Sequence, residues 1–159
     1  MKNLPKRLFV DLEETLIDSW NSGNLWKRER VFAQLNEHFG KDRGILDATV
    51  WSFAVSNDED VKVFNSRFKN WLEEIFGLNF IDVVSKQRIM RDVLKFRGFP
   101  SNAFDEWEFT QIWGKDKSLE NWARANNFEN CEIVLLDDMV QNKTIDFRDW
   151  NLRITFVRM

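Results

Sequence analysis

The strongest constraint on the fold comes from two short apolar runs, each of which is followed directly by aspartate. Residues 8–10 are Leu-Phe-Val and precede Asp11. Residues 133–136 are Ile-Val-Leu-Leu and precede Asp137 and Asp138. Runs of this kind predict buried strands. Open α/β sheets bind ligands beyond the carboxyl ends of their strands, so carboxylates placed there are positioned for chemistry. If the two strands are parallel neighbours, the three aspartates meet at one edge of the sheet.

Strand-like and helix-like segments alternate along the chain. The alternation predicts an α/β fold, a three-layer Rossmann-like domain in which a parallel sheet is flanked by helices. The length of 159 residues fits one domain over 1–159. Apolar or β-branched runs predict strands over residues 8–10, 50–55, 132–136 and 152–157 and a short extended segment over 80–84. Amphipathic patterns predict helices over residues 25–39, 59–76, 85–97 and 119–126.

The composition excludes some kinds of site and argues against some classes of protein. The chain has 15 Phe, 8 Trp and no Tyr, so we expect a substantial aromatic core. A net charge of -3 argues against a protein that holds nucleic acid by overall charge, although a local basic patch stays open. Cys131 is the only cysteine, which excludes an internal disulfide and a thiolate zinc site. Neither a signal peptide nor a membrane span of ~20 apolar residues is evident, so we expect a cytoplasmic protein without a membrane partner.

The acidic residues suggest a metal site. Carboxylates brought together repel one another and raise one another's pKa. A divalent cation removes that repulsion, and oxygen ligands suit Mg²⁺. The alternative is an α/β domain without phosphate chemistry, in which the aspartates only cap turns and helices.

The stretch 8–16, LFVDLEETL, resembles motif I of the haloacid dehalogenase (HAD) superfamily, hhhhDxDxT. Glu13 stands where most phosphatases of that superfamily carry a second aspartate. Asp11 and Thr15 match the other marked positions of the motif.

Later segments match the remaining HAD motifs in order. Ser56 follows the second predicted strand and resembles motif II, and either Lys115 or Lys117 resembles motif III. The pair Asp137 and Asp138 resembles motif IV. With the final predicted strand, this pattern is similar to the magnesium-dependent phosphatase-1 type and its FCP/NIF-like relatives.

The resemblance implies a Mg²⁺-dependent phosphohydrolase. Asp11 would be the nucleophile and would form an aspartyl-phosphate intermediate. Mg²⁺ would be held by Asp11, the backbone carbonyl of Glu13 and Asp138, with Asp137 alongside. The motif III lysine would neutralise charge on the nucleophile and the transferring group.

Further roles follow from the same resemblance. Ser56 would bind a phosphoryl oxygen, with Asn57 and Thr15 as additional substrate-binding residues. The hydroxyl of Thr15 would also hold the motif I turn. Asn142 would support the loop after the acidic pair.

Glu13 leaves three interpretations open. It has the acid–base chemistry of aspartate, but its carboxylate is displaced by one methylene. A misplacement of ~1 Å costs ~100-fold in rate. In the first interpretation, Glu13 acts as general acid and base in a site reshaped to suit it. In the second, it plays the same role but slowly. In the third, turnover is lost and a silent phosphate- or protein-binding module remains.

The spacing of the motifs also bears on the substrate. Residues 16–55 already contain a predicted helix and strand, so no large cap fits there. A small lid could be formed by the aromatic-rich residues 98–113, but we favour a core role for these side chains. An open site suits a large phosphorylated substrate, and the sequence does not choose between a protein, a nucleic-acid end and a sugar phosphate.

Overall fold

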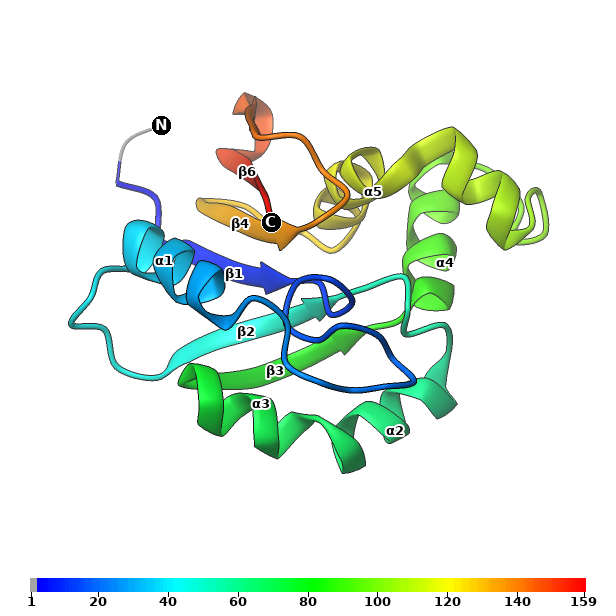
Figure 1. Ribbon diagram of the computed structural model, residues 1–159. Coiled ribbons are helices and arrows are strands. Elements are labelled where there is room, and N and C mark those ends of the chain that lie inside the picture. The colour runs from blue at the N-terminus through cyan, green and yellow to red at the C-terminus, as the bar shows by residue number, and fades with distance from the viewer. Residues whose placement is uncertain (1–2) are drawn as a thin grey trace.

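A six-stranded sheet forms the centre of the computed structural model, which describes residues 3–159 (Figure 1). The strand order is β3-β2-β1-β4-β6-β5. All neighbouring strands are parallel except β5, which pairs antiparallel with β6 at one edge. The strands are β1 (Lys6–Val10), β2 (Leu46–Trp51), β3 (Leu78–Val84), β4 (Cys131–Asp137), β5 (Lys143–Phe147) and β6 (Leu152–Arg158).

Helices cover both faces of the sheet, as expected for the three-layer α/β class (Figure 1). The helices α1, α2 and α3 pack on one face, and α4 and α5 pack on the other. Their bounds are α1 (Arg28–Phe39), α2 (Asp58–Arg67), α3 (Lys69–Phe76), α4 (Lys86–Arg97) and α5 (Glu106–Ala125), with a short 3-10 helix at Arg148–Trp150. Within the described residues, no helix is both long and apolar enough to cross a membrane.

Alternation along β1 divides the core into two layers. Leu8 and Val10 contribute to the cluster beneath α1–α3, and Phe9 contributes to the cluster beneath α4 and α5. The ring of Phe9 lies 6.2 Å from that of Trp51 and 6.0 Å from that of Trp122. The high Phe and Trp content is therefore used largely in packing, because large rings bury the most apolar area per residue.

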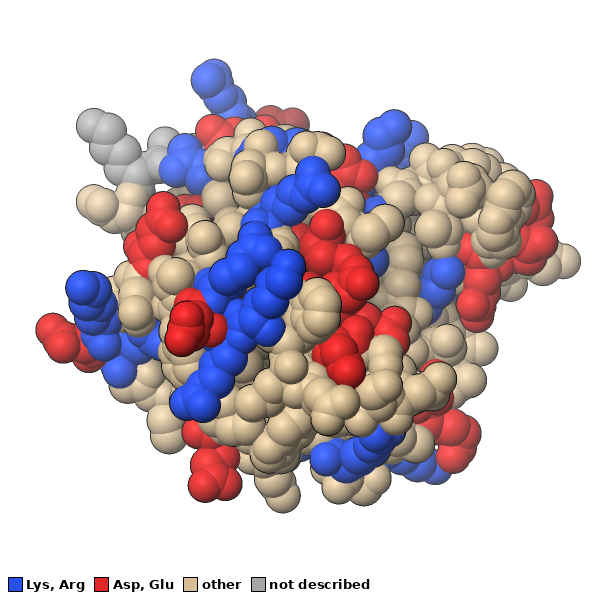
Figure 2. Space-filling model, in the orientation of Figure 1, with Lys and Arg blue, Asp and Glu red and all other residues tan. Residues whose placement is uncertain are grey.

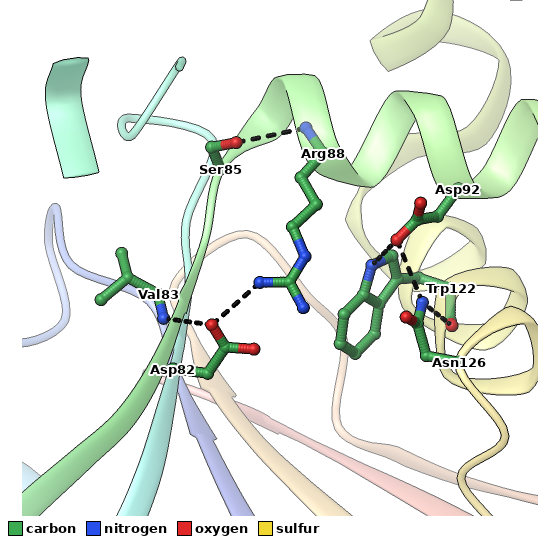
Figure 3. A network of polar contacts seen from close by, with 7 residues as sticks. All are labelled: Asp82, Val83, Ser85, Arg88, Asp92, Trp122 and Asn126. Carbon is green, nitrogen blue, oxygen red and sulfur yellow. Dashed lines mark hydrogen bonds and ion pairs between the residues drawn. The ribbon is translucent and has the colours of Figure 1, made fainter. Parts of the chain in front are cut away.

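A buried polar contact joins α4 to α5 (Figure 3). The carboxylate of Asp92 accepts hydrogen bonds from the indole Nε1 of Trp122 at 3.0 Å and from Nδ2 of Asn126 at 3.2 Å. The indole is almost completely buried, so its N–H needs this partner. On the same face, Arg88 pairs with Asp82 at 2.8 Å.

Several predicted boundaries are wrong. The second strand is β2, Leu46–Trp51, and not residues 50–55. The chain turns at Ser52, whose carbonyl accepts a hydrogen bond from the backbone N–H of Val55 at 3.3 Å. The predicted helix 59–76 is two helices, because the backbone departs from helical geometry at Phe68 (φ -114°, ψ -34°). The short edge strand β5 was not predicted, since its half-exposed residues carry little apolar signal.

The aromatic-rich residues 98–113 contain the start of α5 and both buried and exposed side chains: Phe109 and Trp113 are buried, and Phe99, Trp107 and Ile112 are exposed. The helix begins with a capping box between Asp105 and Glu108. Phe109 is buried and stacks on Trp113 with ring centroids 4.9 Å apart. Phe109 and Trp113 therefore take the core role expected of this segment, whereas the exposed Phe99 and Trp107 do not.

Candidate functional site

Three aspartates meet at the carboxyl ends of β1 and β4, as the sequence predicted. The two strands pair in parallel, and the backbone N–H of Asp11 donates to the carbonyl of Leu136 at 2.9 Å. Carboxylate oxygens of Asp11, Asp137 and Asp138 all lie within 4.8 Å of one another. Asp11 and Asp137 are buried, and Asp138 is half-buried. Strand register therefore holds together groups that repel when ionised.

Lys115 is the cation that enters this acidic cluster. Its Nζ lies 2.9 Å from Oδ2 of Asp137 and 3.2 Å from Oδ1 of Asp11. Lys117, the other candidate for this role, is exposed and makes no such contact. The structure thus selects Lys115 from the two lysines left open by the sequence.

A break in α5 places Lys115 at the site. Gly114 has φ 62° and ψ -167° inside an otherwise helical segment. This backbone conformation is nearly restricted to glycine, because a Cβ would clash with the neighbouring carbonyl. The break divides α5, and the second half begins beside the cluster.

Burial and mutual repulsion perturb the protonation of the cluster. Burial and the nearby charge of Asp11 raise the pKa of Asp137 to about 6, although Lys115 opposes the shift. Burial, together with contacts to Asp11 and Glu14, raises the pKa of Asp138 to about 8. Burial alone would lower the pKa of Lys115, but the charges of Asp11 and Asp137 outweigh it and raise that pKa. Near neutral pH the cluster therefore retains a proton that a divalent cation can displace.

The donor set fits a hard divalent cation such as Mg²⁺. Oδ1 of Asp11 is buried and has no hydrogen-bond partner among residues 3–159, although Lys115 lies within ion-pair distance. Asp138 supplies a second carboxylate beside it. Asp137 is already engaged, since Oδ1 accepts from the backbone N–H of Met139 at 2.8 Å and Oδ2 accepts from Lys115. Asp11 and Asp138 are therefore the residues that could hold such a cation, while Asp137 contacts the lysine.

The cluster opens into a hollow of about 500 Å³, which we call the acidic hollow. Its lining comes from the loops after β1, β2 and β4 and from α5. The residues that matter here are Asp11, Glu13, Asp18, Ser52, Lys115 and Asp138.

Glu13 lines the acidic hollow but its carboxylate does not belong to the aspartate cluster. Oε2 of Glu13 accepts a hydrogen bond from the backbone N–H of Trp20 at 2.6 Å. The longer side chain therefore reaches the following loop, which an aspartate with one methylene fewer would reach less easily. Oε1 of Glu13 accepts no hydrogen bond from residues 3–159.

Asp18 organises the loop that Glu13 contacts, a role the sequence analysis missed. Its Oδ1 accepts from the backbone N–H groups of Ser19 at 2.6 Å and Asn24 at 2.9 Å. The hydrogen bond from the backbone of Asn24 is the main reason that the pKa of Asp18 lies below its usual value. The signal for this role was an aspartate at the start of a segment rich in Asn, Ser and Gly.

Ser52, and not Ser56, is the serine of the acidic hollow. Because β2 ends at Trp51, Ser52 is the first residue beyond the strand, and it is buried against the site. Ser56 lies at the start of α2, where its backbone N–H donates to Asp60 at 2.9 Å. Asn57 is the N-cap of that helix. The prediction for Ser56 and Asn57 needs this correction, because the strand was placed four residues too late.

Of the two residues expected to support the loops of the site, Asn142 makes a supporting hydrogen bond and Thr15 does not. Thr15 is buried, but its hydroxyl has no hydrogen-bond partner in the described part of the chain, so the expected tether of the motif I turn is not seen there. The turn is held instead by backbone bonds such as that from the N–H of Leu16 to the carbonyl of Leu12 at 2.9 Å. Asn142 does brace the segment after β4, since its Oδ1 accepts from the backbone N–H of Arg158 at 2.7 Å.

Known proteins give no independent guide to this arrangement. Comparison of the chain with protein-family models, with curated proteins and with solved structures found no match. The residues of the acidic hollow are therefore the basis for inferring function.

Proposed function

We propose that the protein is a Mg²⁺-dependent phosphohydrolase that acts through Asp11. The observation that carries the proposal is the position of Lys115, whose Nζ lies within 3.2 Å of both Asp11 and Asp137 at the carboxyl edge of the sheet. A nucleophilic carboxylate, a neighbouring cation and an open hollow are the components that phosphoryl transfer requires. The resemblance of residues 8–16 to the HAD motif supports the same chemistry.

The first step transfers the phosphoryl group to the protein. An oxygen of Asp11 forms a bond to phosphorus, and the bond from phosphorus to the ester oxygen breaks with its electron pair. Glu13 donates a proton to the departing oxygen, so the leaving group is a neutral alcohol. The hydroxyl of Ser52, which lines the acidic hollow, would donate a hydrogen bond to a phosphoryl oxygen.

The second step frees Asp11. Glu13, now ionised, accepts a proton from a water molecule while the water oxygen attacks phosphorus. The bond from phosphorus to Asp11 breaks, and inorganic phosphate leaves. Lys115 offsets the negative charge of Asp11 and of the transferring group in both steps. Mg²⁺, held by Asp11 and Asp138, would lower the electrostatic cost of bringing an anionic substrate to an anionic nucleophile.

Glu13 determines how fast this cycle runs. Its hydrogen bond to Trp20 ties the proton-transfer group to the loop formed around Asp18. Proton transfer therefore depends on the order of that loop as well as on the site itself. We place this activity in the cytoplasm, where the single thiol of Cys131 stays reduced.

The second candidate function is a catalytically silent module that binds a phosphorylated partner. The same hydrogen bond favours it, because a carboxylate fixed on Trp20 is less free to reach a leaving group. In that case the aspartate cluster and Lys115 bind phosphate or metal without turnover.

A phosphate-ester panel separates these functions. Wild-type protein, Asp11→Asn and Glu13→Asp are assayed with p-nitrophenyl phosphate and with sugar, peptide and nucleic-acid phosphates, with Mg²⁺ and with EDTA. The proposal predicts hydrolysis by wild type that disappears in EDTA and in Asp11→Asn. A silent module predicts no turnover in any variant, whereas activity that appears only in Glu13→Asp would show an intact site with a displaced acid–base group.

A further inference from the structure

A second hollow, of about 630 Å³, opens directly beside the acidic hollow. We call it the basic hollow, because Lys27, Arg30 and Arg158 line it. The two hollows share part of their lining, namely Glu14, Asp138 and Met139. The two hollows are therefore adjacent, with these three residues at their boundary.

Within the described residues the three cations of the basic hollow form no ion pair, although Lys27 lies over the ring of Trp26. Lys27, Arg30 and Arg158 are exposed, and none of their charged groups forms an ion pair or hydrogen bond with any residue in the described range 3–159. Some exposed cations elsewhere do pair, as Lys62 does with Glu59 at 3.2 Å, and others such as Lys41 and Lys95 do not pair within residues 3–159. Figure 2 shows a continuous band of Lys and Arg side chains that runs alongside a group of acidic side chains on this face. Unpaired charge gathered in one band favours an external anion.

An aromatic side chain lies among these cations. Trp26 lines the basic hollow and is only half-buried. The Nζ of Lys27 lies 5.1 Å from its ring centroid. The backbone N–H of Trp26 donates to the carbonyl of Leu16 at 3.1 Å, which fixes the residue to the turn after β1. The ring is therefore attached to the same turn that carries Asp11.

We propose that the basic hollow binds a single strand of nucleic acid whose terminal phosphate lies in the acidic hollow. The phosphodiesters next to that end would contact Lys27, Arg30 and Arg158, and a base would stack on Trp26. Cations along a groove with an interleaved aromatic ring are the usual means of holding single strands. The placement of the strand end beside Asp11 rests on the proposed function, but the strand contacts do not.

The alternatives fit the hollow less well. A compact sugar phosphate does not need three cations spread from α1 to the end of β6. An acidic peptide would use the cations but has no flat base for Trp26. Glu14 and Asp138 lie between the two hollows and repel any anion, so we expect strand binding to be tighter when Mg²⁺ neutralises this boundary.

Binding of a strand that cannot be hydrolysed tests the inference apart from the enzyme activity. A fluorescein-labelled oligothymidylate with hydroxyl ends is titrated with wild-type protein in Mg²⁺, and anisotropy is followed. Three phosphate contacts on a single strand predict that affinity falls about 20-fold between about 50 and about 200 mM salt. The variant Lys27→Ala/Arg30→Ala/Arg158→Ala should bind at least about tenfold more weakly and lose most of this salt dependence. Trp26→Ala should weaken binding while leaving the salt dependence intact.

A matched control removes the same charge elsewhere. Lys41→Ala/Lys95→Ala/Arg97→Ala alters three exposed cations that do not line the basic hollow and should bind the strand as wild type does. Equal weakening in both triple variants, or no strand binding by wild type at low salt, overturns the inference. So does a phosphopeptide of equal charge, or a nucleoside bisphosphate, that binds as tightly as the strand. Strand binding without hydrolysis of a phosphate-ended strand would instead contradict the proposed function alone.

Discussion

The Nζ of Lys115 lies 3.2 Å from Oδ1 of Asp11, although one residue belongs to the second half of α5 and the other directly follows β1. Both groups are nearly buried, with side-chain exposures of 14% and 3%. The pair depends on Asp137, which receives the same ammonium group at 2.9 Å. The ammonium group of Lys115 therefore both stabilises the buried aspartates and supplies positive charge to the candidate site.

Replacement of Lys115 by methionine should destabilise the protein. Loss of the cation leaves Asp11 and Asp137 buried without compensation, which costs about 3–5 kcal/mol. Urea denaturation at pH 8 measures the loss. The matched control is Lys117→Met, which removes an exposed charge two residues away and should change the free energy of unfolding by less than about 0.5 kcal/mol. Equal effects of the two substitutions would contradict the assignment of Lys115.

Gly114→Ala should disturb both the fold and the site. A side chain at φ 62° and ψ -167° is strained by about 1–3 kcal/mol, and relief of the strain would move Lys115. Thermal unfolding and phosphate-ester hydrolysis both report the change. Gly44→Ala is the control, since its φ is not in the left-handed region and a Cβ there meets no atom within 4 Å. A fully stable and active Gly114→Ala protein would show that the break in α5 is not needed.

Asp92→Ala should lower the free energy of unfolding by weakening the contact between α4 and α5, and it should leave the acidic hollow unchanged. The substitution leaves the buried Nε1 of Trp122 without an acceptor, at a cost of about 1–3 kcal/mol (Figure 3). Denaturant unfolding followed by tryptophan fluorescence measures it. Arg91→Ala, which removes only the exposed partner of the same carboxylate, should cost less than about 1 kcal/mol. A larger loss in Arg91→Ala would mean that the indole bond contributes little.

Stability without metal should fall as pH rises from about 4 to about 8. The pKa values of Asp137 and Asp138, about 6 and about 8 in the folded protein, exceed the ordinary value of 3.8. The folded state therefore binds more protons than the unfolded state between these limits, and the free energy of unfolding decreases with pH. Melting temperatures in EDTA across this range measure the effect.

Mg²⁺ should counteract this loss most strongly at the alkaline end. A cation that displaces the shared proton gains affinity as pH rises, so the increase in melting temperature should be larger at pH 8 than at pH 5. In Asp138→Asn both the pH slope and the response to Mg²⁺ should shrink. A response to Mg²⁺ that is equal at both pH values would contradict metal binding by these carboxylates.

The sequence predicted the sheet and the meeting of Asp11 with Asp137 and Asp138, because buried parallel strands carry a strong apolar signal and their carboxyl ends share one edge. It did not locate Ser52, since the apolar residues after Trp51 belong to a turn and resemble a continued strand. The residues at which a strand begins and ends are decided by its pairing with neighbouring strands, and residue type alone predicts them poorly.

Side-chain partners were harder to predict than elements. The choice between Lys115 and Lys117 depended on the backbone of Gly114, whose unusual φ and ψ cannot be inferred from residue type in a helical segment. The contact of Glu13 with Trp20 depended on a loop folded around Asp18. Such contacts come from long-range geometry, and local patterns do not encode them.

Mass spectrometry of protein quenched in acid during turnover of a phosphate ester with Mg²⁺ directly tests whether Asp11 is the nucleophile. We expect a phosphoryl group on the peptide that contains Asp11, and we expect it to be absent in EDTA and in Asp11→Asn. A phosphoryl group on a different residue, or undiminished hydrolysis by Asp11→Asn, would show that Asp11 is not the nucleophile.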